Sequence, residues 1–188
     1  MSSAGRDALV AMLSRLKVDL SRSDLSRPDE ARRALTSKYP LNGDYIAEVR
    51  RLCDRGLSDG WLCGTGEPDG QDHRLANTSS WFPFSIDASV LEGEAAAHGH
   101  PKGEVGLAWP VDGSPKFCGE DPGWHVFAPK GVHQPAAKGG RVFVLRFRPD
   151  GAVDRKPKAP RRRAASAKAK APAKKRRTKT AKTGTARA

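Results

Sequence analysis

Residues 97–104 read AHGHPKGE. In a β-strand, side chains two residues apart point to the same face, so His98 and His100 are expected to project together from one surface. Glu104 has the same parity, and the proline and glycine between them favour a turn that brings its carboxylate back toward the two imidazoles. This stretch therefore predicts short strands joined by a tight turn, with three metal-ligating side chains on one surface.

A second stretch, GWHVFAPKGVH at residues 123–133, offers a fourth ligand. His133 would lie on a later strand and complete a set of three histidines and one carboxylate. Such a set suits iron(II), manganese, nickel or zinc, with positions left open for water or substrate. We therefore predict one divalent metal bound by His98, His100, Glu104 and His133. The alternative is an exposed pair of histidines without a metal, because isolated histidines are commonly structural or solvated.

Short extended segments separated by glycine and proline surround these two stretches. Many short strands with such turns indicate a sandwich or barrel. The candidate strands are Arg74–Asn77, Phe84–Val90, Glu94–His100, Glu104–Trp109, Trp124–Phe127 and Arg141–Arg148.

The last of these strands has two distinct faces. Phe143, Leu145 and Phe147 share one face, and Arg146 and Arg148 share the other. Alternation of this kind is typical of a strand with one face on the core and one in solvent. We therefore predict a half-buried strand near the end of the fold.

The chain begins with helical patterns. A first amphipathic helix is predicted by four leucines spaced four, three and four residues apart: Leu9, Leu13, Leu16 and Leu20. A second helix is expected to be capped by Ser26, to carry Pro28 in its first turn and to end before Pro40.

A third helix is predicted to start near Asp44. Ile46, Val49, Cys53 and Leu57 fall on one of its faces, and it should stop within residues 56–60. For comparison, the apolar residues expected to continue the second helix are Ala31, Ala34 and Leu35. Residues 1–60 thus form a helical segment, expected to pack on the barrel or to make a dimer contact, so a homodimer is one expected assembly.

The chain of 188 residues has a net charge of +13, but this charge is concentrated at one end. Fifteen of the 34 basic residues lie at residues 155–188, which contain no acidic residue. Residues 1–154 therefore hold 19 basic and all 21 acidic residues and are close to neutral.

Residues 61–154 are expected to be the barrel. The segment at 155–188 is rich in Lys, Arg, Ala and Pro and lacks large apolar residues, so we expect it to be disordered and to contact nucleic acid or other polyanions without sequence preference.

Several classes of protein are disfavoured. Three scattered cysteines suit a reducing cytoplasm better than a disulfide framework. The sequence has no apolar run of about 18 residues, so no membrane segment is expected. It also lacks a G-x-G-x-x-G or P-loop motif, so no nucleotide cofactor is expected.

Two sets of residues resemble known family patterns. Gly93, His98, His100, Glu104 and Gly113, followed by Gly123, Pro129, Gly131 and His133, resemble the two cupin motifs. A wider set resembles the cupin-like family that includes bacterial 4-hydroxylaminobenzoate lyase: GWLC at 60–63, FSID at 84–87, HGHPKGE at 98–104, PGW at 122–124 and GGR at 139–141. The resemblance implies an α+β, mainly β fold, a cupin-like small β-barrel or jelly roll preceded by the helical segment.

The resemblance also implies a lyase that converts 4-hydroxylaminobenzoate to 3,4-dihydroxybenzoate and ammonia. A small aromatic substrate would then need a proton-handling group, for which Glu104 is the candidate. Arg74 is a candidate partner for the carboxylate, and Trp124 a candidate for the wall of an aromatic pocket. The same ligands would also serve a metal-dependent dioxygenase or isomerase. A third alternative is a sensor of small aromatics held on nucleic acid by the tail.

Overall fold

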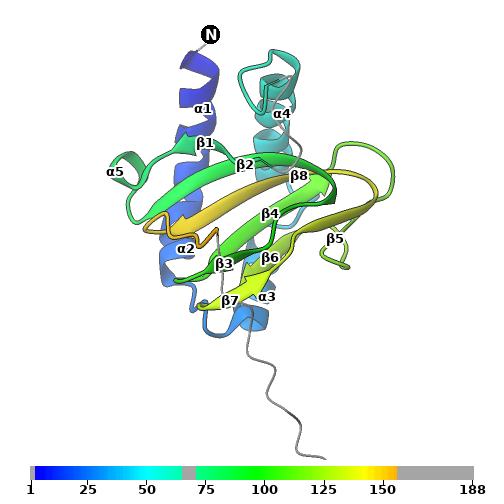
Figure 1. The fold of residues 1–188 in the computed structure, drawn as a ribbon. Coiled ribbons are helices and arrows are strands. Elements are labelled where there is room, and N and C mark those ends of the chain that lie inside the picture. Colours follow the sequence, from blue (N-terminus) through cyan, green and yellow to red (C-terminus); the bar gives the residue numbers. More distant parts are fainter. Residues whose placement is uncertain (1–2, 65–70, 156–188) are drawn as a thin grey trace, which may run out of the picture.

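The computed structural model describes residues 3–64 and 71–155 (Figure 1). The tail predicted to be disordered is residues 155–188, all of which except Arg155 lie outside the described residues. The helices before the strands are α1 (Ser3–Leu13), η1 (Ser14–Leu16), α2 (Lys17–Arg22), α3 (Pro28–Lys38) and α4 (Asp44–Ser58). None of the helices within the described ranges is long and apolar enough to cross a bilayer.

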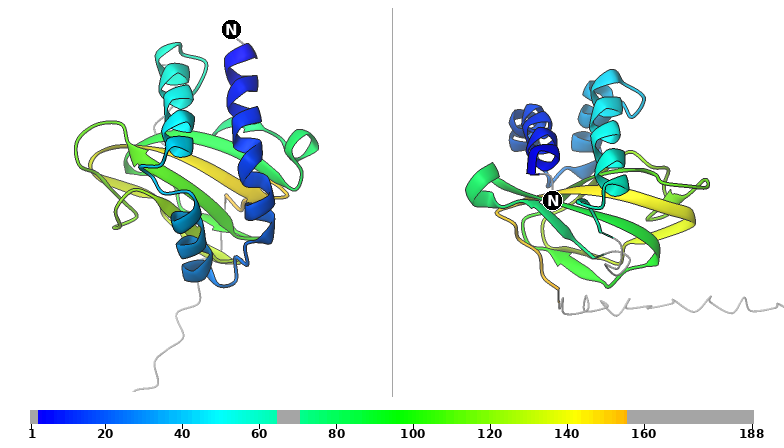
Figure 2. Two further views of the ribbon diagram at one scale, coloured as in Figure 1. Left: turned by 180° about the vertical axis from the view of Figure 1, so that it is seen from behind. Right: turned by 90° about the horizontal axis from the view of Figure 1, so that it is seen from above.

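The leucine stripe of the first helix is buried, as predicted. Leu9, Leu13, Leu16 and Leu20 are each at most 1% exposed, and they join the same apolar core as residues of the sheet. The Arg6 guanidinium donates two hydrogen bonds, of 2.8 and 2.6 Å, to the carbonyl of Leu75 in the first strand. Figure 2 shows the helices together on one face of the sheet. The helical segment therefore packs on the sheet.

Two details of the predicted helices are wrong. Ser26 does not cap α3; its backbone N–H and hydroxyl both donate to Asp24 Oδ1, and the N-cap position falls on Arg27. Ala34 is exposed, because α3 contacts the core through Ala31 and Leu35 only. An alanine fits either face of a helix, so its position in the apolar pattern was weak evidence.

The strands form two antiparallel sheets. Their bounds are β1 (His73–Ala76), β2 (Phe84–Glu94), β3 (His98–His100), β4 (Glu104–Pro110), β5 (Lys116–Phe117), β6 (Trp124–Phe127), β7 (Gly131–His133) and β8 (Ala136–Pro149), with the short helix α5 (Thr78–Trp81) between β1 and β2. The large sheet has the order β1-β2-β8-β4-β6, with β5 added on β8, and the small sheet pairs β3 with β7.

The mainly β fold with helices before it is confirmed, with changes in strand bounds. Glu94 ends β2 rather than beginning the strand that holds His98. β8 begins at Ala136, ahead of the predicted start at Arg141, because its first residues pair with β5 and with the end of β2.

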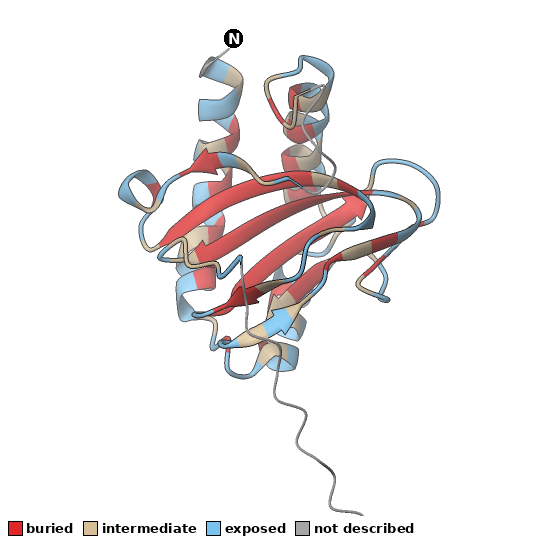
Figure 3. Ribbon diagram, in the orientation of Figure 1, coloured by how far each residue is buried: buried red, intermediate tan, exposed pale blue. Residues whose placement is uncertain are grey.

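The prediction that the last strand is half-buried is wrong, because both faces of β8 are covered. Phe143, Leu145 and Phe147 share an apolar core with the helices, while Arg146 and Arg148 are 2% and 0% exposed on the opposite face. The small sheet lies over that second face, and Figure 3 shows β4, most of β2 and the second half of β8 buried. The arginines therefore lie inside the barrel.

Candidate metal centre

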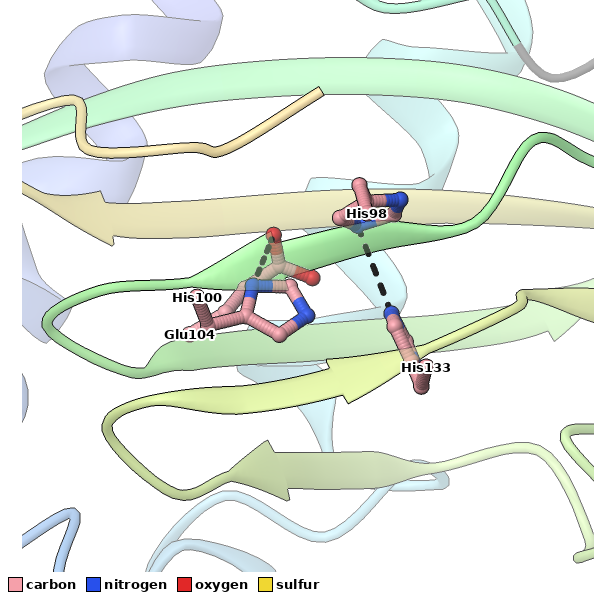
Figure 4. Close-up of side chains that lie close together, drawn as sticks. All are labelled: His98, His100, Glu104 and His133. Atoms are coloured by element: carbon pink, nitrogen blue, oxygen red, sulfur yellow. Dashed lines mark hydrogen bonds and ion pairs between the residues drawn. The ribbon is translucent and has the colours of Figure 1, made fainter. Parts of the chain in front are cut away.

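The four predicted ligands come together inside the barrel (Figure 4). The pairing of β3 with β7 places His98 opposite His133, and His100 opposite Gly131. After the turn at residues 101–103, Glu104 is the first residue of β4. One ligand atom from each of the four side chains lies within 4.8 Å of the others. That spread is close to twice the usual metal–ligand distance of about 2.1 Å.

The turn between β3 and β4 is held by backbone hydrogen bonds. The Gly103 and Lys130 N–H groups both donate to the His100 carbonyl, at 3.2 and 2.7 Å. Gly103 has a φ of +86°, and a Cβ at this position would lie 2.9 Å from the Phe127 carbonyl oxygen. Only glycine fits this turn without strain. The turn therefore fixes where Glu104 enters the site.

The histidine nitrogens are available as ligands. Both ring nitrogens of His100 and Nδ1 of His133 are buried without a hydrogen bond, and the nearest carboxylate atom to His100 Nδ1 is Glu104 Oε2 at 3.5 Å (Figure 4). The Nε2 atoms of His98 and His133 face each other at 3.3 Å, and His98 Nδ1 lies 3.3 Å from the Ala96 carbonyl oxygen. If that Nδ1 carries the proton, the His98 Nε2 lone pair points into the cluster.

Burial also keeps the imidazoles neutral. It lowers the pKa of His100 to about 4 and that of His133 to about 3, and it also lowers the pKa of His98. Neutral imidazole is the form that binds a metal. Buried polar nitrogens without partners are rare in folded proteins and require an explanation. The donor set therefore fits a divalent first-row metal.

Glu104 is a buried carboxylate held by arginines. Burial by itself would raise the pKa of Glu104, but the Arg148 and Arg146 guanidiniums outweigh it and hold that pKa below its usual value. Arg148 Nε donates to Glu104 Oε2 at 2.6 Å, while Arg146 Nε lies 3.7 Å from Oε1. Glu104 is therefore ionised at neutral pH, which suits a metal ligand and makes it a weak base. Its proton-handling role stays a prediction.

Sequence reasoning missed the polar network beneath the cluster. Arg148 also donates to Asp72 Oδ2 at 2.8 Å and to Asp87 Oδ2 at 3.0 Å. Arg146 Nη1 donates to Ser89 Oγ at 2.5 Å. The alternation of residues 143–148 correctly separated the two faces of β8. It carried no information on whether the second face meets water or another sheet.

The two predicted substrate-binding residues do not join the cluster. Arg74 pairs with Asp87 and donates to Asn77 Oδ1 at 3.1 Å, with its side chain 38% exposed. Trp124 is 3% exposed in the core shared with the helices, and its indole N–H donates to the Tyr39 carbonyl at 2.8 Å. The next residue of β6, His125, is also buried, and its ring lies 4.9 Å from that of Phe117. Both substrate roles stay predictions that this placement does not favour.

The family model described as 4-hydroxylaminobenzoate lyase matches residues 20–155, which include the whole cluster and the network beneath it. The chain belongs to the 4-hydroxylaminobenzoate lyase family. The family resemblance predicted from the motifs is thereby confirmed.

Individual relatives agree with this family assignment. A 4-hydroxylaminobenzoate lyase from Nocardioides sp. (strain LMS-CY) is 26% identical over 161 residues, covering 78% of this chain and 90% of the relative. Another from Pseudomonas putida is 24% identical over 141 residues, covering 64% of this chain and 80% of the relative.

Among solved structures, a cupin-2 domain-containing protein from Shewanella frigidimarina NCIMB 400 is 16% identical to this chain. The match covers 44% of this chain and 83% of that protein, with a TM-score of 0.34.

Proposed function

We propose that this member of the 4-hydroxylaminobenzoate lyase family converts 4-hydroxylaminobenzoate, or a close hydroxylaminoaryl carboxylate, to 3,4-dihydroxybenzoate with release of ammonia. The observation that carries the proposal is the cluster of three neutral histidines and one carboxylate inside the region that the family model matches. The reaction takes up one water and releases one ammonia, so the atoms balance without an oxidant or reductant. This agrees with the expectation that no nucleotide cofactor is needed.

The chain's own residues define what the site can do. His98, His100, Glu104 and His133 would hold a divalent metal, which supplies a Lewis acid at the mouth of the cluster. The Phe127 ring stacks on His100 with centroids 5.2 Å apart and lies 4.0 Å from the His133 centroid. This aromatic wall excludes water from one side of the cluster and offers a surface for a substrate ring.

Glu104 acts in this proposal as a fixed negative charge. Arg148 holds one of its oxygens, and the other oxygen, Oε1, receives no direct hydrogen bond from Arg146 across 3.7 Å. Oε1 is therefore the atom that can ligate a metal or accept a proton. A Glu104→Gln substitution removes the charge while keeping the shape. It should lower turnover by about a hundredfold or more if Glu104 also transfers protons.

The test uses the full chain loaded in turn with iron(II), manganese, nickel and zinc. Under anaerobic conditions, 4-hydroxylaminobenzoate should give ammonia and 3,4-dihydroxybenzoate in equal amounts. The double variant His98→Ala/His100→Ala should lose this activity, while His73→Ala, a histidine of β1 outside the cluster, should keep it. A product that retains its nitrogen, or a strict need for oxygen, would assign the site to another reaction. Binding without turnover would favour a sensor.

A further inference from the structure

A cavity of about 470 Å³ opens beside the cluster of His98, His100, Glu104 and His133. Its walls include His133 of the cluster and, among other residues, Phe127, Cys118, Glu94, Gln134 and Lys138. Pockets for small organic ligands usually fall in the range of about 300–1,000 Å³. The cavity is thus large enough for a single aromatic ring and shares His133 with the candidate metal centre.

One wall of the cavity suits an aromatic ring. The partly buried Phe127 contacts both His133 and His100 through its ring. Ala136 and Cys118 add small, weakly polar surface, and the Cys118 N–H is already used in a hydrogen bond to the Ala136 carbonyl at 2.8 Å. A flat apolar ligand therefore finds stacking contacts without leaving these backbone groups unpaired.

The charged part of the wall is Lys138. Its neighbour in register is Lys116 of β5, whose ammonium pairs with Asp121 at 2.5 Å. Lys138 is exposed and has no ion pair with any acidic residue of the described ranges. Glu94 also lines the cavity, where its Oε2 accepts a hydrogen bond from the Gln134 amide at 3.3 Å. The cavity thus presents one uncommitted cation and one carboxylate engaged by a neutral amide.

We propose that this cavity binds the ring of an arene carboxylate, with the carboxylate on Lys138 and the opposite substituent at the cluster. Lys138 is then a specificity-determining residue of the site, in the place that Arg74 had in the sequence-based prediction. The inference rests on the proposed function for the identity of the reacting substituent. Its physical basis is a ring-sized space that carries His133 of the cluster on one part of its wall and the Lys138 cation on another.

The test measures occupancy without turnover. Cys118 lines the cavity and is partly buried, and burial raises the pKa of its thiol, so alkylation by iodoacetamide at mildly alkaline pH should be slow enough to follow. 4-Aminobenzoate should slow this alkylation, and 4-aminobenzamide, which lacks the negative charge, should protect less. Cys63, which does not line the cavity, is read in the same peptide map as an internal control.

Variants give opposite expectations. Lys138→Met should weaken protection by 4-aminobenzoate about three- to fivefold, the size expected for an exposed ion pair. Glu94→Gln should strengthen protection, because it removes the repelling carboxylate. Lys116→Met, the matched lysine on the neighbouring strand, should leave protection unchanged. In turnover, Lys138→Met should raise KM and leave kcat nearly unchanged, because the carboxylate is remote from the reacting atoms.

Equal protection by the acid and the amide, or equal behaviour of the Lys138 and Lys116 variants, would overturn the inference. The outcome separates it from the proposed lyase activity. Charge-dependent protection without ammonia release would refute the lyase and keep the binding site. Ammonia release with a KM that is unchanged in Lys138→Met would support the lyase activity and refute the role of Lys138 in binding.

Discussion

Replacing Arg148 by methionine should strongly destabilise the fold. Arg148 is 0% exposed, and its guanidinium donates hydrogen bonds to Glu104, Asp72 and Asp87, which come from three separate parts of the chain. Methionine fills much of the same space but leaves these carboxylates without their shared cation. Removing one partner of a buried ion pair typically costs about 3–5 kcal/mol. We expect a loss of this size in the free energy of unfolding at neutral pH.

The loss should shrink as the pH falls. In the wild type, burial opposes ionisation of Glu104 and Asp72, but Arg148 and Arg146 hold the pKa of each carboxyl below its usual value. Stability from such groups is present above the unfolded-state pKa and is lost as pH falls through the folded-state pKa. Without Arg148, one of the charges that oppose the effect of burial is lost, so both pKa values rise and the folded variant binds more protons than the folded wild type. The difference in free energy of unfolding between variant and wild type should therefore become smaller as the pH falls toward the usual carboxyl pKa.

Urea unfolding of the full chain, followed by tryptophan fluorescence at neutral and mildly acidic pH, measures both effects. Arg148→Lys keeps a cation and should lose less, which preserves the test if the methionine variant does not fold. Arg51→Met is the matched control, because Arg51 pairs with Glu48 on the surface of α4 and its side chain is 52% exposed. Surface pairs contribute little, so its midpoint should match the wild type. A methionine variant as stable as this control, or a loss independent of pH, would refute the reasoning.

Three further predictions concern other parts of the chain. The first is that the full chain, supplied with iron, manganese, nickel and zinc, binds metal that elemental analysis detects, and that His98→Ala/His100→Ala lowers the bound metal to background. A wild-type protein that holds no metal would contradict the ligand assignment. The second is that Leu13→Ala lowers the free energy of unfolding, measured with urea, by about 2–5 kcal/mol. Val18 of α2 is 55% exposed, so Val18→Ala should lower it little, and equal losses would argue against the packed leucine stripe. We also propose that residues 155–188 bind polyanions, so deleting them should abolish a salt-sensitive gel shift with DNA and leave turnover intact; salt-insensitive binding, or binding by the truncated chain, would contradict this.

The features predicted correctly from the sequence depend on local periodicity. The spacing of Leu9, Leu13, Leu16 and Leu20 places them on one face of any helix they form. Strand parity does the same for His98 and His100, and glycine and proline at residues 101–103 allow the turn that returns Glu104 to them. A period relates residues that are close in the chain. For that reason the helices, most of the strands and the grouping of three ligands follow from local spacing, while His133 was predicted from a second, separate stretch of sequence.

The tertiary structure decided which faces are covered and which distant residues meet. The pairing of β3 with β7 brings His133 to His98, and the small sheet over β8 turns the Arg146 and Arg148 face into a barrel interior. The same choice of faces puts Trp124 against the helices instead of the cluster. Alternation shows that two faces differ, but burial depends on what packs against each one. That is a property of chain segments far apart in sequence, and no local pattern contains it.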